Sequence, residues 1–112
     1  FLAGSNADSL IHNNEISANG VGSNLGMDIR ATNDRLNITS NSIRTNGTDF
    51  NEGISISSGN RNLILDNIIR TNGTGANNNG IQHGGNSQSA KIINNTIILL
   101  LFEPIIIHRL FF

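Results

Sequence analysis

Apolar and polar residues alternate in a short unit that recurs along the chain. Its three copies are Gly26–Ile29, Gly53–Ile56 and Gly80–His83, and both steps between them are 27 residues. In each copy an apolar residue follows the glycine, a polar one comes next, and the first two copies end in isoleucine. Alternation with a period of two predicts a short strand with one buried face.

A second unit, apolar-x-x-Asn-x-Ile, recurs between these copies. Its first apolar position is Ile11, Ile38, Ile64 and Ile92, its asparagine is Asn14, Asn41, Asn67 and Asn95, and its last position is Ile16, Ile43, Ile69 and Ile97. The asparagines are 27, 26 and 28 residues apart. The unit predicts two further strands with a bend at the asparagine. The Asn-Gly pairs that follow it, such as Asn46-Gly47, are expected to turn the chain out into a loop.

Two independent units with one period indicate a repeat architecture. No single coil could bury its isoleucine face, so stacking of successive coils has to create the core. The asparagine at each bend is expected to point inward and to hydrogen-bond to its copies in the neighbouring coils. We therefore predict an all-β, right-handed parallel β-helix, a single-stranded solenoid of about four coils of about 27 residues, over residues 1–98.

Leucine-rich repeats are the competing architecture, because they share the period and the L-x-x-N-x-L fragment. That repeat also requires apolar residues five and eight positions before the asparagine. For Asn67 these positions hold Asn62 and Gly59. The linking segment 72–79, NGTGANNN, is also unsuited to a helix.

The pattern GIxI…xIxxNxIxxNG over residues 9–98 resembles the right-handed parallel β-helix repeats of pectate lyases, polygalacturonases, alginate epimerases and NosD-like periplasmic proteins. The resemblance implies a secreted or cell-envelope location and a carbohydrate-associated role. It also implies that this chain is a fragment whose parent has further coils. Since a fold by itself does not fix function, these implications are analogies.

Net charge and composition restrict the classes of partner that the chain is expected to bind. The net charge of −1 has no basic excess of the kind that nucleic-acid-binding proteins carry. The 20 Asn and 18 Ile of the 112 residues suit turns and strands, and the absence of Cys excludes disulfides and thiolate metal sites. We expect neither nucleic acid nor a resident cofactor, apart from the calcium considered below.

The C-terminal segment 99–112 departs from the repeat. It is rich in apolar residues and lacks the Asn-Gly pair, and the run of six apolar residues at 97–102 is too short to span a bilayer. Three interpretations stay open: a cap on the last coil, a strand that docks on another protein, or a non-native end.

Candidate binding residues lie on the outward positions of the Gly-apolar-x-apolar strand. Asp28, Ser55 and Gln82 form one column, and Arg30 and Ser57, with Gly84, form the next. The resemblance places substrate over this face, with Asp28 and Arg30 as the candidate catalytic pair. The resembling enzymes use several clustered carboxylates or carboxylate-bound calcium, and Asp28 has no carboxylate neighbour in its column. A solvated ion pair is the simpler interpretation.

Two other sets of residues are candidates for chemistry. Asp49 and Glu52, with Asn51, are candidate oxygen ligands for calcium, although their spacing matches no EF-hand loop. His83 aligns with the inward positions Ile29 and Ile56, which favours a buried histidine with a backbone partner over a general base.

Arginines also stack in the repeat. Arg44 aligns with Arg70, and Arg35 with Arg61, which suits an anionic polysaccharide or a solvated surface. Our leading hypothesis is a carbohydrate-associated segment without an active site of its own. A lyase, hydrolase or epimerase acting on uronate polymers and a structural, adhesin-like solenoid are the alternatives. Uncapped coil ends also predict self-association.

Overall fold

The computed structural model describes residues 6–75, 77–85 and 88–101, which form twelve strands and no helix. The strands build three parallel sheets of four strands each. The first sheet has the order β1-β4-β7-β10, and its strands are β1 (Asn6–Ala7), β4 (Leu25–Asp34), β7 (Glu52–Ser58) and β10 (Asn79–His83). The second has the order β2-β5-β8-β11, and its strands are β2 (Leu10–His12), β5 (Asn37–Thr39), β8 (Leu63–Leu65) and β11 (Lys91–Ile93). The third has the order β3-β6-β9-β12, and its strands are β3 (Glu15–Asn19), β6 (Ser42–Gly47), β9 (Ile68–Gly73) and β12 (Thr96–Leu101).

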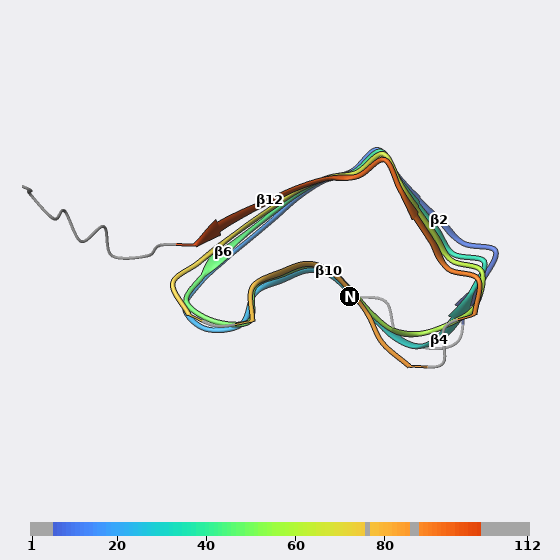
Figure 1. The fold of residues 1–112 in the computed structure, drawn as a ribbon, viewed down its shortest axis with the longest axis horizontal. Helices are drawn as coiled ribbons and strands as arrows, with labels where there is room; N and C mark the ends of the chain where they lie inside the picture. Colours follow the sequence, from blue (N-terminus) through green and yellow to red (C-terminus); the bar gives the residue numbers. More distant parts are fainter. Residues whose placement is uncertain (1–5, 76, 86–87, 102–112) are drawn as a thin grey trace, which may run out of the picture.

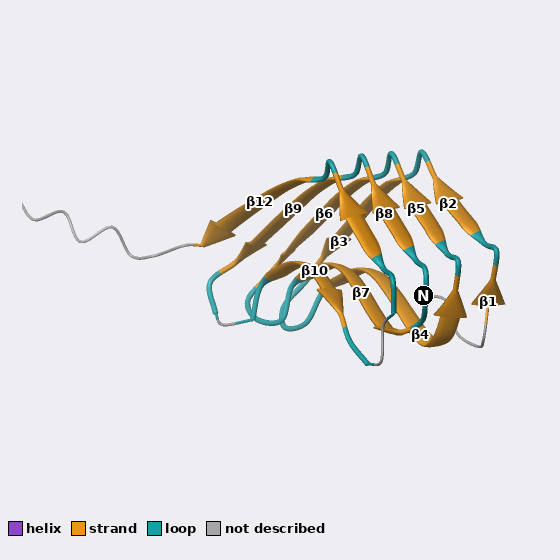
Figure 2. Ribbon diagram, turned by 45° about the vertical axis from the view of Figure 1, so that its right-hand side comes forward, coloured by secondary structure: helices purple, strands orange, loops and turns teal. Residues whose placement is uncertain are grey.

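The chain winds through one strand of each sheet in turn, so that successive coils lie over one another (Figure 1). Figure 2 shows the copies of each strand side by side along the stack. This confirms the predicted parallel β-solenoid and its spacing of about 27 residues. The solenoid has about three turns rather than the predicted four. Four stacked copies of a strand are joined by three complete turns of the chain.

Each bend between the second and third sheets is made by the residue that precedes the repeated asparagine (Asn14, Asn41, Asn67 or Asn95). Asn13, Ser40, Asp66 and Asn94 there have φ between 52° and 56°. The corner that leads into the second sheet is built in the same way, by Asp8, Arg35, Arg61 and Ser89, with φ between 54° and 59°. The Asn-Gly pairs do not make these turns: Asn46-Gly47 and Asn72-Gly73 still pair in register at the ends of β6 and β9.

The predicted asparagine ladder is present at the corner between the second and third sheets. Asn14 Nδ2 donates to Asn41 Oδ1, and Asn41 Nδ2 donates to Asn67 Oδ1, both at 2.9 Å. Asn67 continues the series to Asn95 Oδ1 at 2.9 Å. Each Oδ1 also accepts the backbone N–H of the ladder asparagine one coil earlier. The ladder thus satisfies the corner's polar groups inside the stack, where water cannot.

A second ladder, which the sequence analysis missed, runs through Asn24, Asn51 and Asn78. Asn24 Nδ2 lies 3.1 Å from Asn51 Oδ1, and Asn51 Nδ2 lies 2.7 Å from Asn78 Oδ1. The glycines of the Asn-Gly pairs make room for it: a Cβ on Gly47 would overlap the Asn24 amide, and one on Gly73 would overlap the Asn78 amide. The pair is therefore required for packing rather than for a left-handed turn.

The core consists of the predicted apolar columns in the inner coils. Buried members are Met27, Ile29, Leu36, Ile38, Ile43, Ile54, Ile56, Ile64 and Ile69. The glycines that open the Gly-apolar-x-apolar strands set the width of the coil. A Cβ on Gly26, Gly53 or Gly80 would overlap an isoleucine Cγ2 of the third sheet, which belongs to Ile43, Ile69 and Ile97 respectively. The first and third sheets can approach this closely only because those positions have no side chain.

Variation in repeat length is absorbed around the first sheet. Its own strands keep a constant step, with Leu25 opposite Glu52 and Glu52 opposite Asn79. β4 accommodates one extra residue through a register shift between Ile29 and Thr32. The remaining differences fall in the segments between strands, where added residues displace no core side chain.

The third sheet extends into the predicted C-terminal segment. β12 continues to Leu101, with Leu99 opposite Thr71 and Leu100 opposite Asn72. Residues 102–112, the rest of that segment, lie outside the described residues. Among the described residues there is no helix of the length and hydropathy needed to cross a membrane.

Two buried threonines show where a polar group in the core lacks a hydrogen bond. The hydroxyls of Thr45 and Thr71, residues with 0% exposure, contact no hydrogen-bond partner among the described residues. Replacing such a hydroxyl with a methyl group removes a desolvation penalty. We expect Thr71→Val to raise the free energy of unfolding by about 1 kcal/mol. Chemical denaturation of the variant and of wild type measures this, and a loss of stability would show that the hydroxyl is bonded.

Candidate functional site

The first predicted column on the outer face of the first sheet is formed in register. Asp28 on β4 lies opposite Ser55 on β7, which lies opposite Gln82 on β10. The second column is displaced, because the register shift after Ile29 pairs Thr32 with Ser58 and leaves Arg30 out of step with Ser57. The strands therefore bring three of the five candidate residues into one row.

Asp28 and Arg30 form an ion pair on this face. Arg30 Nη2 lies 2.9 Å from Asp28 Oδ2, and Nε donates to both carboxylate oxygens at 3.1 and 2.9 Å. The hydrogen bond to Asp28, with its negative charge, raises the pKa of the Arg30 guanidinium above its already high value. A proton held more tightly makes Arg30 a poorer general base. The pair resembles a structural contact more than a poised catalytic dyad.

The two candidate calcium ligands lie in different environments. Glu52 is buried, with 8% exposure, at the start of β7, and the Gln82 amide donates to its carboxylate in the orientation that satisfies both groups. Asp49 is exposed in the preceding loop, with its carboxylate against Gly75 of the next coil. Across residues 6–75, 77–85 and 88–101, no three histidine or acidic side chains gather as they would around a metal ion.

His83 is half-buried at the end of β10, opposite Ile56 as the alignment predicts. Its Nε2 lies 3.3 Å from Nδ2 of the Asn62 side chain. Asn62 Oδ1 already accepts the N–H of Leu36 at 3.0 Å, so the amide presents its Nδ2 donor to the ring. His83 Nε2 therefore lies against an amide donor, which suits a structural histidine.

The two sets of stacked arginines differ in whether an acidic side chain pairs with them. Arg35 Nη2 donates to Asp8 Oδ2 at 2.7 Å, and this hydrogen bond lowers the pKa of the Asp8 carboxyl. On the third sheet, Arg44 of β6 lies directly opposite Arg70 of β9. Within the described part of the chain, neither of these two arginines is in an ion pair. Two like charges held one strand spacing apart repel each other.

A shallow pocket of about 340 Å³ lies over these two arginines. Glu15, Ile16, Ser17 and Ser42 complete its lining. Ser17 precedes Arg44 in the same column, and Glu15 lies opposite Ser42 at the start of the strands. The guanidinium and hydroxyl groups form a row of donors along the stack, with one carboxylate at its margin. Such a row suits an extended ligand with anionic groups.

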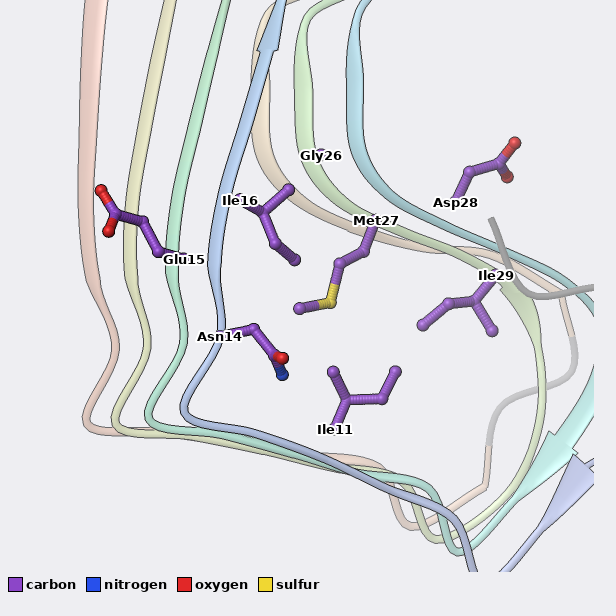
Figure 3. A pocket seen from close by; sticks show the side chains of 8 residues that line it. All are labelled: Ile11, Asn14, Glu15, Ile16, Gly26, Met27, Asp28 and Ile29. Atoms are coloured by element: carbon purple, nitrogen blue, oxygen red, sulfur yellow. The ribbon is translucent and has the colours of Figure 1, made fainter.

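A second pocket, of about 360 Å³, opens at the first coil. Figure 3 shows Ile11, Ile16, Met27 and Ile29 pointing toward one another in its interior, with Asp28 and Glu15 directed outward. Asn14 points in at the corner. The same columns are covered by neighbouring coils deeper in the stack, so this pocket lies beside the first described coil.

The outward column, the arginine stack and an Asp28–Arg30 ion pair were predictable from the sequence, since the period and the alternation bring these residues together. The contact between Glu52 and Gln82 was not predictable, because it depends on side-chain rotamers. Comparison with protein-family models, with curated proteins and with solved structures gives no match for this chain.

Proposed function

We propose that this chain is a non-catalytic, carbohydrate-associated segment of a secreted or cell-envelope β-helix protein, and that it binds an anionic polysaccharide. The observation that carries the proposal is the pair Arg44 and Arg70, in register on an outer face and without an ion-pair partner among the described residues. Adjacent strands are about 4.8 Å apart, so an extended polymer along the axis presents its charges to successive coils. The resemblance of the repeat to pectate-lyase-like proteins supports the class of ligand by analogy.

Charge and hydrogen bonding favour this face over the first sheet. There the Asp28 carboxylate engages the nearby arginine, and the remaining outward groups are neutral. On the third sheet the arginines and the hydroxyls of Ser17 and Ser42 are positioned to donate to carboxylate or sulfate oxygens. A bound anion would also relieve the repulsion between the two guanidinium groups.

Binding of polygalacturonate, measured by isothermal titration calorimetry, tests the proposal. We expect saturable binding that weakens about tenfold when Arg44 and Arg70 are both replaced by alanine, because exposed charge-assisted contacts contribute about 0.5–1 kcal/mol each. Added salt should weaken it further. Arg61→Ala is the matched control, since Arg61 is exposed but lies away from this face.

Two results would overturn the proposal. Equal binding by the wild-type protein and the double alanine variant would remove the arginine pair from the interface. Depolymerisation of the uronate polymer by the chain itself, abolished by Asp28→Ala, would make the segment an enzyme rather than a non-catalytic one.

A structural role as an adhesin-like solenoid is the second candidate. The two asparagine ladders favour it, because they tie each coil to its neighbours along the stack. Specific, saturable binding of one glycan would count against a purely structural role.

A further inference from the structure

One acidic side chain borders the pocket that Arg44 and Arg70 line. Glu15 on β3 lies opposite Ser42 on β6, in the outward column beside that of the arginines. Its side chain is exposed, and Figure 3 shows it directed away from the core. A carboxylate and two guanidinium groups therefore surround one binding surface, and a ligand placed there would meet charges of both signs.

Glu15 does not pair with these arginines in the structure. Within the described ranges, its carboxylate forms no ion pair with Arg44 or Arg70. Since Ser42 comes two residues before Arg44 on β6, Glu15 is the diagonal neighbour of Arg44. Such neighbours are about 7–8 Å apart, a distance over which charges still act at physiological salt. An anion bound at Arg44 would therefore be repelled by Glu15 if it lay toward the first described coil.

The groups that a ligand would contact change along the stack. In the first described coil they are the Glu15 carboxylate and the Ser17 hydroxyl. In the next two coils they are the guanidinium groups of Arg44 and Arg70. Ser17 Oγ accepts from Asn19 Nδ2 at 2.9 Å, which leaves the hydroxyl hydrogen to donate. The first coil thus suits hydroxyl groups, which can donate to a carboxylate, and the next two suit an anion.

A single carboxylate of a ligand can serve both arginines. Arg44 and Arg70 lie opposite each other on adjacent strands, which are about 4.8 Å apart. Each carboxylate oxygen can accept from one guanidinium group, and the anion then offsets the repulsion between the two. Because a sugar unit is similar in length to one coil spacing, the next unit toward the first coil would lie over Glu15. A second carboxylate there would meet a like charge, whereas a neutral unit could donate its hydroxyl groups.

We propose that Glu15 sets the charge spacing of the ligand, so that this face prefers a polysaccharide in which carboxylate-bearing units alternate with neutral, hydroxyl-rich ones. The inference rests on the proposed function, because it specifies which anionic polymer the arginine pair binds. Glu15 is then a specificity-determining residue. It disfavours polymers with a carboxylate on every unit and accepts hydrogen bonds from alternating ones.

Two hexasaccharides that carry only carboxylates test the inference on the full chain. Hexagalacturonate has a carboxylate on every unit, and a hyaluronan hexasaccharide has one on every second unit. Isothermal titration calorimetry at low salt should show that wild type binds the hyaluronan fragment about threefold more tightly, although it carries half the charge. Glu15→Gln removes the charge and keeps the size of the side chain. It should strengthen hexagalacturonate binding about fivefold and change hyaluronan binding by less than about twofold.

Asp49→Asn is the matched control, because it makes the same change of net charge at an exposed residue outside the pocket. It should leave the ratio of the two dissociation constants as it is in wild type. Glu15→Lys should reverse the preference, since it adds a third cation beside the two arginines. Circular dichroism verifies that each variant is folded.

The outcomes separate this inference from the proposed function. Suppose that both hexasaccharides bind and that replacing Arg44 and Arg70 with alanine weakens both. If Glu15→Gln and Asp49→Asn then shift the ratio equally, or if wild type binds hexagalacturonate more tightly, only the inference fails. If neither hexasaccharide binds wild type, or if the double alanine variant binds both as wild type does, the arginine pair is not the binding surface and both proposals fail.

Discussion

Replacing Asn67 with alanine is expected to lower the free energy of unfolding by about 4 kcal/mol. Asn67 is buried, and its Oδ1 accepts from both the N–H and the Nδ2 of Asn41 at 2.9 Å. Its Nδ2 donates to the Ile38 carbonyl and to Asn95 Oδ1, also at 2.9 Å. Alanine leaves the Asn41 N–H and the Ile38 carbonyl buried without these partners, and each such loss costs about 1–3 kcal/mol. Water cannot replace the lost partners inside the stack.

Urea denaturation followed by circular dichroism measures the effect. Asn37→Ala is the matched control, because Asn37 is an exposed strand residue of the same type, and its stability should change by less than about 0.5 kcal/mol. Asn67→Asp should not rescue the loss, since a carboxylate keeps the acceptor but lacks the donor. Equal stability of Asn67→Ala and Asn37→Ala would mean that the ladder contributes nothing to the fold.

Gly53→Ala is expected to cost about 4 kcal/mol for a steric reason. The new Cβ would overlap Ile69 Cγ2 and would lie 2.5 Å from the Gly80 carbonyl oxygen of the next coil. A core side chain can give way slightly, but a backbone carbonyl in a paired strand cannot move without opening the sheet. Overpacking of this severity exceeds the usual 1–3 kcal/mol of an added methyl group.

A double-mutant cycle separates the two contacts. Ile69→Ala removes the Cγ2, so Gly53→Ala should cost less in that background than in wild type, and the residual loss reports the carbonyl contact. Gly22→Ala is the control: its Cβ would meet no atom within 4 Å, and only its φ of 93° makes it cost about 1 kcal/mol. If Gly53→Ala costs no more than Gly22→Ala, the close approach of the sheets does not require glycine.

Most of the architecture was predictable because it is periodic. The columns that contain Ile38 and Ile43, and the ladder that contains Asn41, follow from counting, since a solenoid places equal positions of successive coils over one another. The corners were not predictable in the same way. Ser40, Asp66 and Arg35 adopt left-handed φ although none of them is glycine, and the backbone N–H of each donates to a carbonyl of the next coil.

The candidate site was predictable only in part. Period and alternation placed Asp28, Ser55 and Gln82 in one row, and Arg44 beside Arg70. Neither property reports what a side chain contacts, so the Asp28–Arg30 pair in its bidentate form and the buried Glu52 emerged from the structure alone. The second ladder has the same 27-residue step, because Asn24, Asn51 and Asn78 each lie two residues before the glycine of a Gly-apolar-x-apolar strand. The period could therefore have revealed it.

The strand pairings join residues at a nearly constant separation of 26 to 28 positions, as Glu15 with Ser42, Ser42 with Ile68 and Ile68 with Thr96 show. This constancy governs how the chain acquires its structure. Closing one coil loses about 3 kcal/mol of chain entropy, and the loss is the same for every coil, however many have already formed. The free-energy barrier to folding therefore lies mainly in forming the first pair of coils, because each further coil adds to an existing template. Adding coils should leave unchanged the rate at which any one pair of coils nucleates folding. Each added coil should slow complete unfolding.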